Sequence, residues 1–210
     1  MCPARSLRFL LWRNPLIGRP SGSYIFTTFS KPGSLKQLVK HISPGVQKKA
    51  AKIKLILFDV DGVLTDGGII IDDRGVEAKR FDVRDGQGIT LLIHFGIKVG
   101  FITGRYSNIV RRRAKELGVT IVYQGVKNKV QIYDRIKRKT GLKDEQIAYV
   151  GDDILDLPVL RKVGLAITVR DCWPGLKSRV DYITKSEGGR GAVREVSELM
   201  LKLQDMWKEL

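Results

Sequence analysis

Short apolar runs alternate with amphipathic stretches of helical length from Lys52 onward, and this alternation limits the folds that the chain can adopt. Five runs have the length and continuity of strands that are buried on both faces: residues 53–58, 99–102, 120–123, 147–150 and 165–169. Each stretch between them precedes a glycine that is typical of a helix end: residues 87–95, 107–117, 127–140 and 154–163. Strands that alternate with helices predict an α/β fold in which helices flank a parallel sheet.

One stretch departs from this alternation. Residues 68–71 and 77–81 flank the sequence Asp72-Asp73-Arg74-Gly75, which predicts a β-hairpin with a turn at its tip. The tip is rich in Asp, but it lacks the ligand spacing and the terminal Glu of a calcium-binding loop. We therefore interpret the tip as a solvated turn.

Residues 1–50 differ from the rest of the chain. They contain five prolines and nine Lys or Arg but no Asp or Glu, and so supply more than half of the formal net charge of +16. We expect this basic segment to be a disordered extension or the product of an incorrectly assigned start, with an organelle transit peptide as the alternative. The catalytic domain is then expected over residues 51–210.

Composition excludes several function classes. No apolar run approaches the roughly 20 residues that cross a bilayer, so we expect no membrane partner. The basic residues are not interleaved with aromatic residues in a recognisable binding motif, which argues against nucleic acid. The chain has two cysteines, Cys2 and Cys172, which makes a disulfide framework improbable and favours the cytoplasm.

Four polar clusters follow the ends of predicted strands or open the next helix. They are Asp59-Val60-Asp61, Thr103-Gly104-Arg105, Lys129, and Gly151-Asp152-Asp153 with Asp156. Each cluster alone is typical of turns and helix caps. Because ligands bind outside the carboxyl ends of strands in open parallel sheets, the four clusters are expected to converge.

The residue types in these clusters suit one chemistry. Converging carboxylates repel one another unless a cation lies between them, and Mg²⁺ binds few protein oxygens while leaving positions for phosphate oxygens. A carboxylate can attack phosphorus and form an aspartyl-phosphate. Lys129, Thr103 and backbone N–H groups can then position and neutralise the phosphoryl group. The pattern therefore predicts a magnesium-dependent phosphatase.

The four clusters resemble the motifs of the haloacid dehalogenase superfamily, in the same order over residues 53–170. The resemblance implies a Rossmann-like sheet, with Asp59 as nucleophile and metal ligand. It further implies that Asp61 binds metal through its backbone carbonyl and serves as acid and base through its side chain. Thr103 and Lys129 would hold the phosphoryl group. Asp152 would complete the metal site, with Asp153 and Asp156 orienting the waters of the metal.

A closer resemblance covers residues 53–200. The sequences Phe81-Asp82-Val83-Arg84-Asp85-Gly86-Gln87-Gly88, Tyr123-Gln124-Gly125 and Gly188-Gly189-Arg190-Gly191 are similar to those of 3-deoxy-D-manno-octulosonate 8-phosphate phosphatases. The spacing of the motifs leaves no room for the cap domain that is usual in the superfamily. Members of this capless family are typically homotetramers in which hairpins pack together and the Gly-rich tail approaches the site of an adjacent subunit.

Carried over residue by residue, the resemblance implies a pocket for the sugar acid phosphate. Its residues are Asp61, Asp82, Val83, Arg84, Asp85, Gly86, Thr90, Gly104, Arg105, Arg113, Lys129 and Arg190. A phosphatase for a nine-carbon sialic-type acid 9-phosphate is the nearest alternative, and a non-catalytic binding protein with the same fold is another. Cys172 and Trp173 replace small or polar residues of the family, so the role of their loop is left open.

Overall fold

The computed structural model describes residues 41–209 of the 210-residue chain, and the description that follows concerns these residues. Six parallel strands form one sheet in the order β5-β4-β1-β6-β7-β8. The strands are β1 (Leu55–Phe58), β4 (Lys98–Ile102), β5 (Ile121–Tyr123), β6 (Ile147–Gly151), β7 (Leu165–Thr168) and β8 (Tyr182–Ile183). The first five confirm the strand predictions to within two residues. The sequence did not reveal β8, because it has two residues and is partly exposed.

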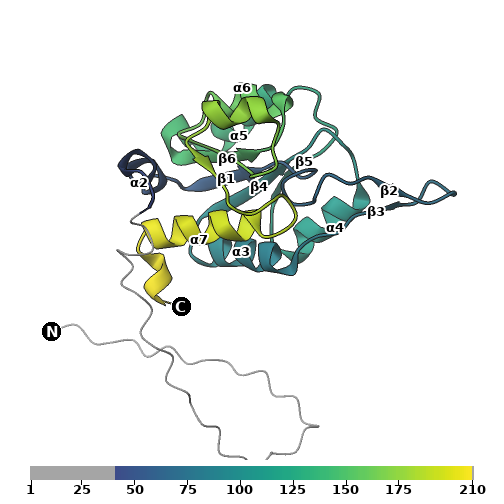
Figure 1. The fold of residues 1–210 in the computed structure, drawn as a ribbon, viewed down its shortest axis with the longest axis horizontal. Helices are drawn as coiled ribbons and strands as arrows, with labels where there is room; N and C mark the ends of the chain where they lie inside the picture. The colour runs from purple at the N-terminus through teal and green to yellow at the C-terminus, as the bar shows by residue number, and fades with distance from the viewer. Residues whose placement is uncertain (1–40, 210) are drawn as a thin grey trace, which may run out of the picture. The chain divides into compact units, whose positions relative to one another are not determined.

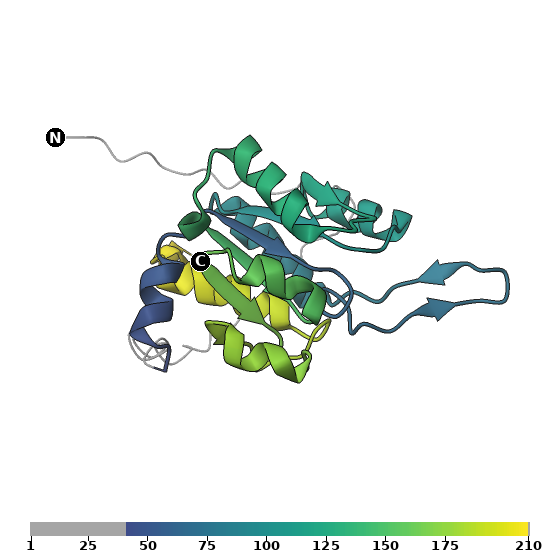
Figure 2. The ribbon, with the colours of Figure 1, turned by 90° about the horizontal axis from the view of Figure 1, so that it is seen from above.

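Helices cover both faces of the sheet (Figures 1 and 2). One face carries α3 (Val83–His94), α4 (Asn108–Glu116) and α7 (Ala192–Leu203), and the other carries α5 (Lys129–Thr140) and α6 (Leu157–Leu160). Short 3₁₀ helices span Asp144–Gln146, Ile154–Asp156, Pro174–Arg179 and Met206–Glu209. The Rossmann-like α/β architecture is confirmed. Within the described residues, no helix combines the length and the apolar character needed to cross a bilayer.

Two predicted helices have different bounds. Helix α3 begins at Val83 rather than at residue 87, because the Asp82 carboxylate accepts a hydrogen bond from the N–H of Arg84 at 2.7 Å and caps the helix. The predicted helix 154–163 is instead a 3₁₀ turn followed by the four-residue α6. Pro158 lies in the first turn of α6, where its missing N–H costs no hydrogen bond.

The compact domain begins before the boundary at residue 51 that the sequence suggested. Residues 1–40 lie outside the described part, but Pro44–Ala50 form helix α2, which packs against α7 and β7. Ser43 caps this helix, Pro44 occupies its first turn, and Val46 and Ala50 are buried in the core. Burial of this face therefore orders a segment whose composition predicts an extension.

The predicted hairpin is present and projects from the domain (Figures 1 and 2). Strands β2 (Ile70–Ile71) and β3 (Glu77–Ala78) are antiparallel, and they pair Ile70 with Ala78. Asp72 closes the tip by accepting hydrogen bonds from the N–H groups of Arg74 and Val76 at 3.0 and 2.8 Å. The tip is thus the solvated turn that its sequence indicates.

Candidate active site

The register of the three central strands brings the polar clusters together. Strand β1 is fully buried between β4 and β6, and its last residue, Phe58, lies opposite Phe101 and Val150. The chain then continues into Asp59 from the end of β1, into Thr103 after β4 and into Asp152 after β6. These ends lie where the strand order reverses direction around β1, which is the usual ligand site of such sheets.

Lys129 connects the nucleophile candidate to a buried carboxylate. It is the first residue of α5, and its ammonium group lies 2.9 Å from Asp59 Oδ1 and 2.7 Å from Asp156 Oδ1. The Asn128 side chain caps this helix by accepting a hydrogen bond from the N–H of Gln131 at 3.1 Å. Burial alone would lower the pKa of Lys129, but Asp59 and Asp156 outweigh it, so the net direction of the pKa is upward. Lys129 is therefore held in its cationic form.

Three carboxylates and one ammonium group share this pocket. Oxygens of Asp59, Asp152 and Asp156 all lie within 4.8 Å of one another. Burial raises the pKa of Asp59 to about 6, although Lys129 opposes the effect. Burial, followed by the charges of Asp59 and Asp156, raises the pKa of Asp152 to about 8. The protein groups thus leave a local excess of negative charge, which a divalent cation would compensate.

The donor atoms fit a hard cation such as Mg²⁺. Asp152 Oδ1 is buried and accepts no hydrogen bond from the described residues, and the buried Asp59 Oδ1 has only the ion pair with Lys129 among them, which is unusual for carboxylate oxygens. Gly62 has φ +94°, and a Cβ atom there would meet Asp152 Oδ2 at 2.1 Å, so glycine allows the backbone to approach this carboxylate. The pocket therefore offers Asp152 Oδ1, which no donor of the described residues satisfies, beside the Asp59 carboxylate as oxygen ligands.

The carboxylates of Asp156 and Asp153 both accept hydrogen bonds from nearby protein groups. Asp156 Oδ1 also accepts a hydrogen bond from the Tyr149 hydroxyl at 2.6 Å, and Oδ2 accepts the N–H groups of Asp152 and Asp153 at 3.0 and 3.2 Å. Asp156 thereby fixes the loop that carries Asp152. The exposed Asp153 side chain accepts the N–H of Ile154 at 2.7 Å and caps the following 3₁₀ helix.

Asp61 lies beside the phosphoryl-binding candidates. Thr103 Oγ1 donates a hydrogen bond to Asp61 Oδ2 at 3.4 Å, while the ammonium group of Lys79 contacts Asp61 Oδ1. Lys79 also lies 3.3 Å from Glu77, which in turn pairs with Arg105 at 2.8 Å. Hydrogen bonds from Ser107, Arg105 and Lys79 lower the pKa of Glu77 to about 2. This chain of alternating charges runs from Arg105, after β4, through Glu77 and Lys79 at the hairpin to Asp61.

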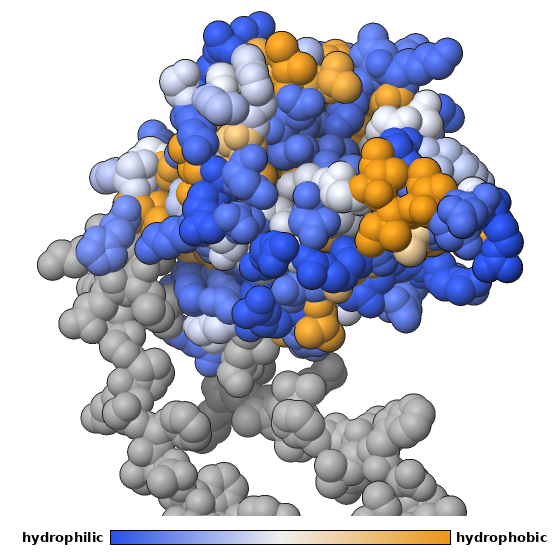
Figure 3. All heavy atoms as spheres, turned by 45° about the vertical axis from the view of Figure 1, so that its right-hand side comes forward, coloured by the Kyte–Doolittle hydropathy of each residue, from blue (hydrophilic) through white to orange (hydrophobic). Residues whose placement is uncertain are grey.

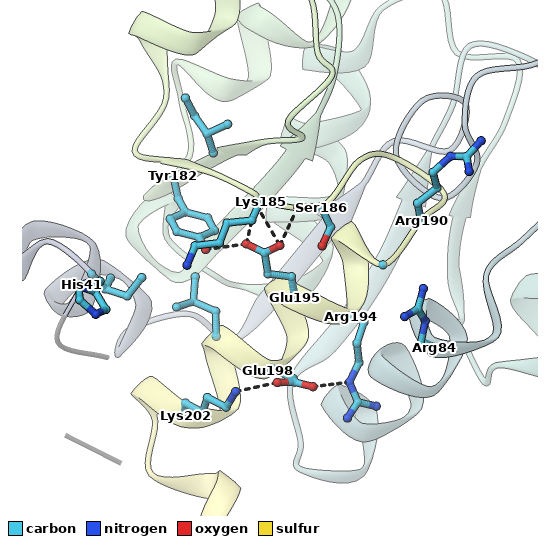
Figure 4. Close-up of a pocket in the computed structure, with 14 residues that line it drawn as sticks. His41, Arg84, Tyr182, Lys185, Ser186, Arg190, Arg194, Glu195, Glu198 and Lys202 are labelled. Carbon is cyan, nitrogen blue, oxygen red and sulfur yellow. Dashed lines mark hydrogen bonds and ion pairs between the residues drawn. The ribbon is translucent and has the colours of Figure 1, made fainter. Parts of the chain in front are cut away.

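The structure separates the predicted site residues into three groups. The first group lines one cavity of about 230 Å³: Asp59, Asp61, Thr103, Gly104, Arg105, Lys129, Asp152, Asp153 and Asp156. The second group, Asp82, Val83, Arg84 and Arg190, lines a neighbouring cavity of about 450 Å³. Arg84 and Arg190 also face a cleft of about 540 Å³ beside α7 (Figure 4). In this cleft Glu195 accepts a hydrogen bond from the Tyr182 hydroxyl, and Glu198 forms ion pairs with Arg194 and Lys202.

The third group lines neither of these cavities. Asp85 is 1% exposed and accepts the N–H groups of Gly191 and Arg194 at 3.2 and 2.7 Å. A Cβ atom on Gly86 would meet the Arg113 guanidinium at 2.2 Å, and Arg113 itself pairs with Glu116. Thr90 Oγ1 donates a hydrogen bond to the Gln87 carbonyl within its own helix at 2.9 Å. Asp85 and Gly86 thus contact the elements beside α3, whereas the Thr90 hydroxyl bonds within the helix.

Sequence reasoning missed several residues that shape the site. The sequence did not identify Lys79 and Glu77 as site residues, because a hairpin segment is expected to be solvated. Their spacing of two residues, which places them on the same side of a strand, was the available signal. Tyr149 was read only as part of an apolar strand. The Trp173 N–H donates a hydrogen bond to the Asp152 carbonyl at 2.8 Å, so the loop whose role was left open supports the metal-site candidate.

Comparisons with known proteins agree with this geometry. The family model of haloacid dehalogenase-like hydrolases matches residues 88–164. The 3-deoxy-D-manno-octulosonate 8-phosphate phosphatase of Escherichia coli is 46% identical over 176 residues, which are 83% of this chain and 94% of that protein. The chain belongs to the 3-deoxy-D-manno-octulosonate 8-phosphate phosphatase family. This membership confirms both resemblances that the motifs indicated.

Solved structures of the family have the same fold. The Yersinia pestis phosphatase aligns with a TM-score of 0.79 at 44% identity, and the match covers 80% of this chain and 90% of that one. The Moraxella catarrhalis phosphatase was solved in complex with magnesium, phosphate and 3-deoxy-D-manno-octulosonate (KDO). It aligns with a TM-score of 0.77 at 43% identity and covers 78% and 94% of the two chains.

Proposed function

We propose that this protein hydrolyses 3-deoxy-D-manno-octulosonate 8-phosphate to the free sugar acid and phosphate, through an aspartyl-phosphate on Asp59. One observation carries the proposal: Oδ1 of the buried Asp59 carboxylate lies 2.9 Å from the Lys129 ammonium group, beside Asp152, whose buried Oδ1 accepts no hydrogen bond from the described residues. This arrangement suits a nucleophile that must meet an anionic phosphoryl group. Family membership supplies the substrate class.

The residues divide the reaction into two steps. An Asp59 oxygen forms a bond to phosphorus while the bond from phosphorus to the sugar oxygen breaks, and Asp61 gives its proton to the departing sugar oxygen. Asp61 then takes a proton from a water molecule, whose oxygen attacks phosphorus and releases Asp59 and phosphate. Thr103 and Lys129 hold the phosphoryl oxygens in both steps.

Mg²⁺ would be held by the side chains of Asp59 and Asp152 and by the backbone carbonyl of Asp61. When bound, it neutralises charge on the carboxylates and on the phosphoryl group. Asp156 would support this site indirectly, because its oxygens already fix Lys129 and the backbone of Asp152 and Asp153. The assignment of Asp153 to the metal site is weaker than that of Asp156, because the Asp153 carboxylate accepts the N–H of Ile154 and caps the 3₁₀ helix.

The substrate is a sugar acid and therefore carries a carboxylate as well as a phosphate. Arg84 and Arg190 lie in the neighbouring cavity, and both guanidinium groups are more than half exposed. Among residues 41–209, Arg190 has only long ion pairs, at 3.8 and 3.9 Å, and is available to an anionic ligand. We assign these two residues to the sugar acid, with Arg105 at the border of the phosphoryl cavity.

We further propose that copies of the chain associate through the hairpin, as a homotetramer by the family resemblance. Four apolar hairpin residues are more than half exposed: Ile69, Ile70, Ile71 and Val76. Figure 3 shows apolar side chains gathered on the face that comes forward with the hairpin. An exposed apolar strand pair is a typical surface for association of identical subunits.

The test measures phosphate release from 3-deoxy-D-manno-octulosonate 8-phosphate by the wild type and by Asp59→Asn, with Mg²⁺ and with a chelator. We expect turnover that requires Mg²⁺ and that falls below detection in Asp59→Asn. Cleavage of a nine-carbon sialic-type acid 9-phosphate in preference to this substrate would overturn the eight-carbon assignment. Failure to cleave any phosphate ester would overturn the enzyme assignment itself.

A further inference from the structure

A lysine on the hairpin reaches the acid and base candidate. The side chain of Lys79 is 1% exposed, and its ammonium group contacts Asp61 Oδ1. Lys79 is buried and does not line the phosphoryl cavity, whereas Asp61, which it contacts, does. Burying an ammonium group costs free energy unless the group is paired, and the Lys79 ammonium is paired with the carboxylates of Asp61 and Glu77.

The position of Lys79 is fixed from its other side. Glu77 lies 3.3 Å from the Lys79 ammonium, and Arg105 and Ser107 hold Glu77 in turn. Glu77 and Lys79 are two residues apart at β3, so they extend toward the same side of the hairpin. The Glu77–Lys79 pair thus reaches Asp61 from the base of the hairpin as one preorganised unit.

The contacts distinguish the two oxygens of Asp61. Oδ1 contacts the Lys79 ammonium group, whereas Oδ2 accepts, from the part of the chain that the structure describes, only the 3.4 Å hydrogen bond from Thr103, the residue assigned to the phosphoryl group. We propose that Lys79 is a positioning residue that holds Asp61 Oδ1 and thereby directs Asp61 Oδ2 toward the leaving-group oxygen. The inference rests on the proposed function, in which Asp61 donates the proton to that oxygen.

The leaving group provides the test. A sugar alkoxide departs only if it is protonated, whereas p-nitrophenolate is a stable anion that needs no proton. The ratio kcat/KM reports the steps up to and including formation of the aspartyl-phosphate. We expect Lys79→Met to lower kcat/KM by about 100-fold for the sugar acid phosphate and by less than about tenfold for p-nitrophenyl phosphate. The loss should lie in kcat rather than in KM, because Lys79 does not contact the substrate.

Further variants separate positioning from folding. Lys79→Arg keeps the cation and should recover most of the lost activity. Glu77→Gln should show a smaller loss of kcat/KM with the same dependence on the leaving group. This variant replaces Lys79→Met in the test if circular dichroism shows that Lys79→Met does not fold. In the Asp61→Asn background, Lys79→Met should cost nothing further, because the two residues act as one unit. Arg74→Met removes an exposed cation at the hairpin tip and should match the wild type.

Two results would overturn the inference. One is an equal loss on both substrates, which would indicate a structural role only. The other is an additional loss when Lys79→Met is combined with Asp61→Asn. If the wild type cleaves p-nitrophenyl phosphate but not the sugar acid phosphate, the substrate assignment fails separately. The Lys79 comparison is then made with glycerol 3-phosphate, another alkyl ester.

Discussion

At the scale of single residues, the pocket around Asp59 is governed by uncompensated charge. Asp59, Asp152 and Asp156 bring three carboxylates together, and Lys129 provides the one ammonium group in contact with them among the described residues. The raised pKa values of Asp59 and Asp152 express the cost of this repulsion and burial. A bound divalent cation relieves that cost, so metal binding and stability are linked.

This linkage predicts the effect of removing one carboxylate. Asp152→Asn should raise the melting temperature in chelator, because it removes a buried charge that repels Asp59 and Asp156. The same change should abolish the rise in melting temperature that excess Mg²⁺ gives the wild type, since it removes a ligand. Thermal unfolding of both proteins, with chelator and with Mg²⁺, measures the two effects together.

Asp205→Asn is the matched control. It removes a carboxylate from an exposed site with φ 62°, a conformation that Asn tolerates well. This variant should keep the full Mg²⁺-dependent rise. A metal-dependent rise in Asp152→Asn as large as that of the wild type would remove Asp152 from the set of metal ligands.

At the scale of elements, the packing of α3 on α7 depends on two residues of α3. A Cβ atom on Gly88 would meet Ser197 Oγ at 2.8 Å and the Arg194 Cα at 3.1 Å, so glycine permits the close approach of the two helices. Asp85 accepts backbone N–H groups at the start of α7. Burial raises the pKa of Asp85 to about 6, although these two hydrogen bonds lower it in part.

The raised pKa of Asp85 predicts how stability depends on pH. Because the folded-state pKa of about 6 exceeds the ordinary value of 3.8, the folded protein binds a proton more readily than the unfolded chain in this window. The contribution of Asp85 to stability is therefore lost as pH rises from about 4 to about 6. Asp85→Asn removes this loss. Relative to the wild type, the variant should gain up to about 3 kcal/mol between pH 4 and pH 7.

Denaturant unfolding of both proteins across this pH range measures the difference. Glu198→Gln on α7 is a control with the opposite sign. Burial opposes the shift, but hydrogen bonds from Lys202 and Arg194 lower the pKa of Glu198. Glu198 thus stabilises the fold above its unfolded-state pKa, and Glu198→Gln should lose stability relative to the wild type as pH rises. Parallel pH profiles for Asp85→Asn and the wild type would show that Asp85 carries no titration of this kind.

The same elements show what a sequence reveals and what it conceals. Strands β1, β4, β6 and β7 were predictable because burial on both faces leaves continuous apolar runs, and the half-buried edge strand β5 keeps a run of the same kind. The start of α3 was not, because Gly86 and Gly88 disfavour a helix locally. Their small size is required by tertiary contacts, with Arg113 of α4 for Gly86 and with α7 for Gly88. Helix α2 carried its signal in Ser43 and Pro44, but the acid-free composition around it predicted disorder.

The site divides in the same way. The structure brings Asp59, Thr103, Lys129 and Asp152 together as predicted, because parallel strands end at one edge of a sheet. Residues whose role depends on side-chain packing were beyond reach. Asp85 was expected in a substrate loop, and the structure buries it at the start of α3. Arg113 lies on α4, as its predicted helix indicates, and its contacts with Gly86 and Glu116 depend on packing. Lys79 required knowledge of how the base of the hairpin meets Asp61.

At the scale of the whole molecule, the capless architecture leaves the phosphoryl cavity without a lid of its own. Between β1 and β6 the chain adds only the hairpin, α3, β4, α4, β5, α5 and a short 3₁₀ helix. The cavity has about 230 Å³, and Arg84 and Arg190 lie in a different one. An association of subunits through the hairpin would exclude water from this open site, in place of a cap.

Replacement of Ile69 and Ile71 by Asp tests this association. The two side chains are more than half exposed and, two residues apart, share one side of the hairpin. Burying the new charges in an interface is costly, so the double variant should dissociate to a species of lower mass in light scattering while its circular dichroism stays unchanged. Its kcat/KM for the sugar acid phosphate should fall by about tenfold or more if the neighbouring subunit closes the site. Ile183→Asp, an apolar-to-acidic change outside the hairpin, should leave the mass unchanged. Equal mass for the double variant and the wild type would place the subunit interface elsewhere.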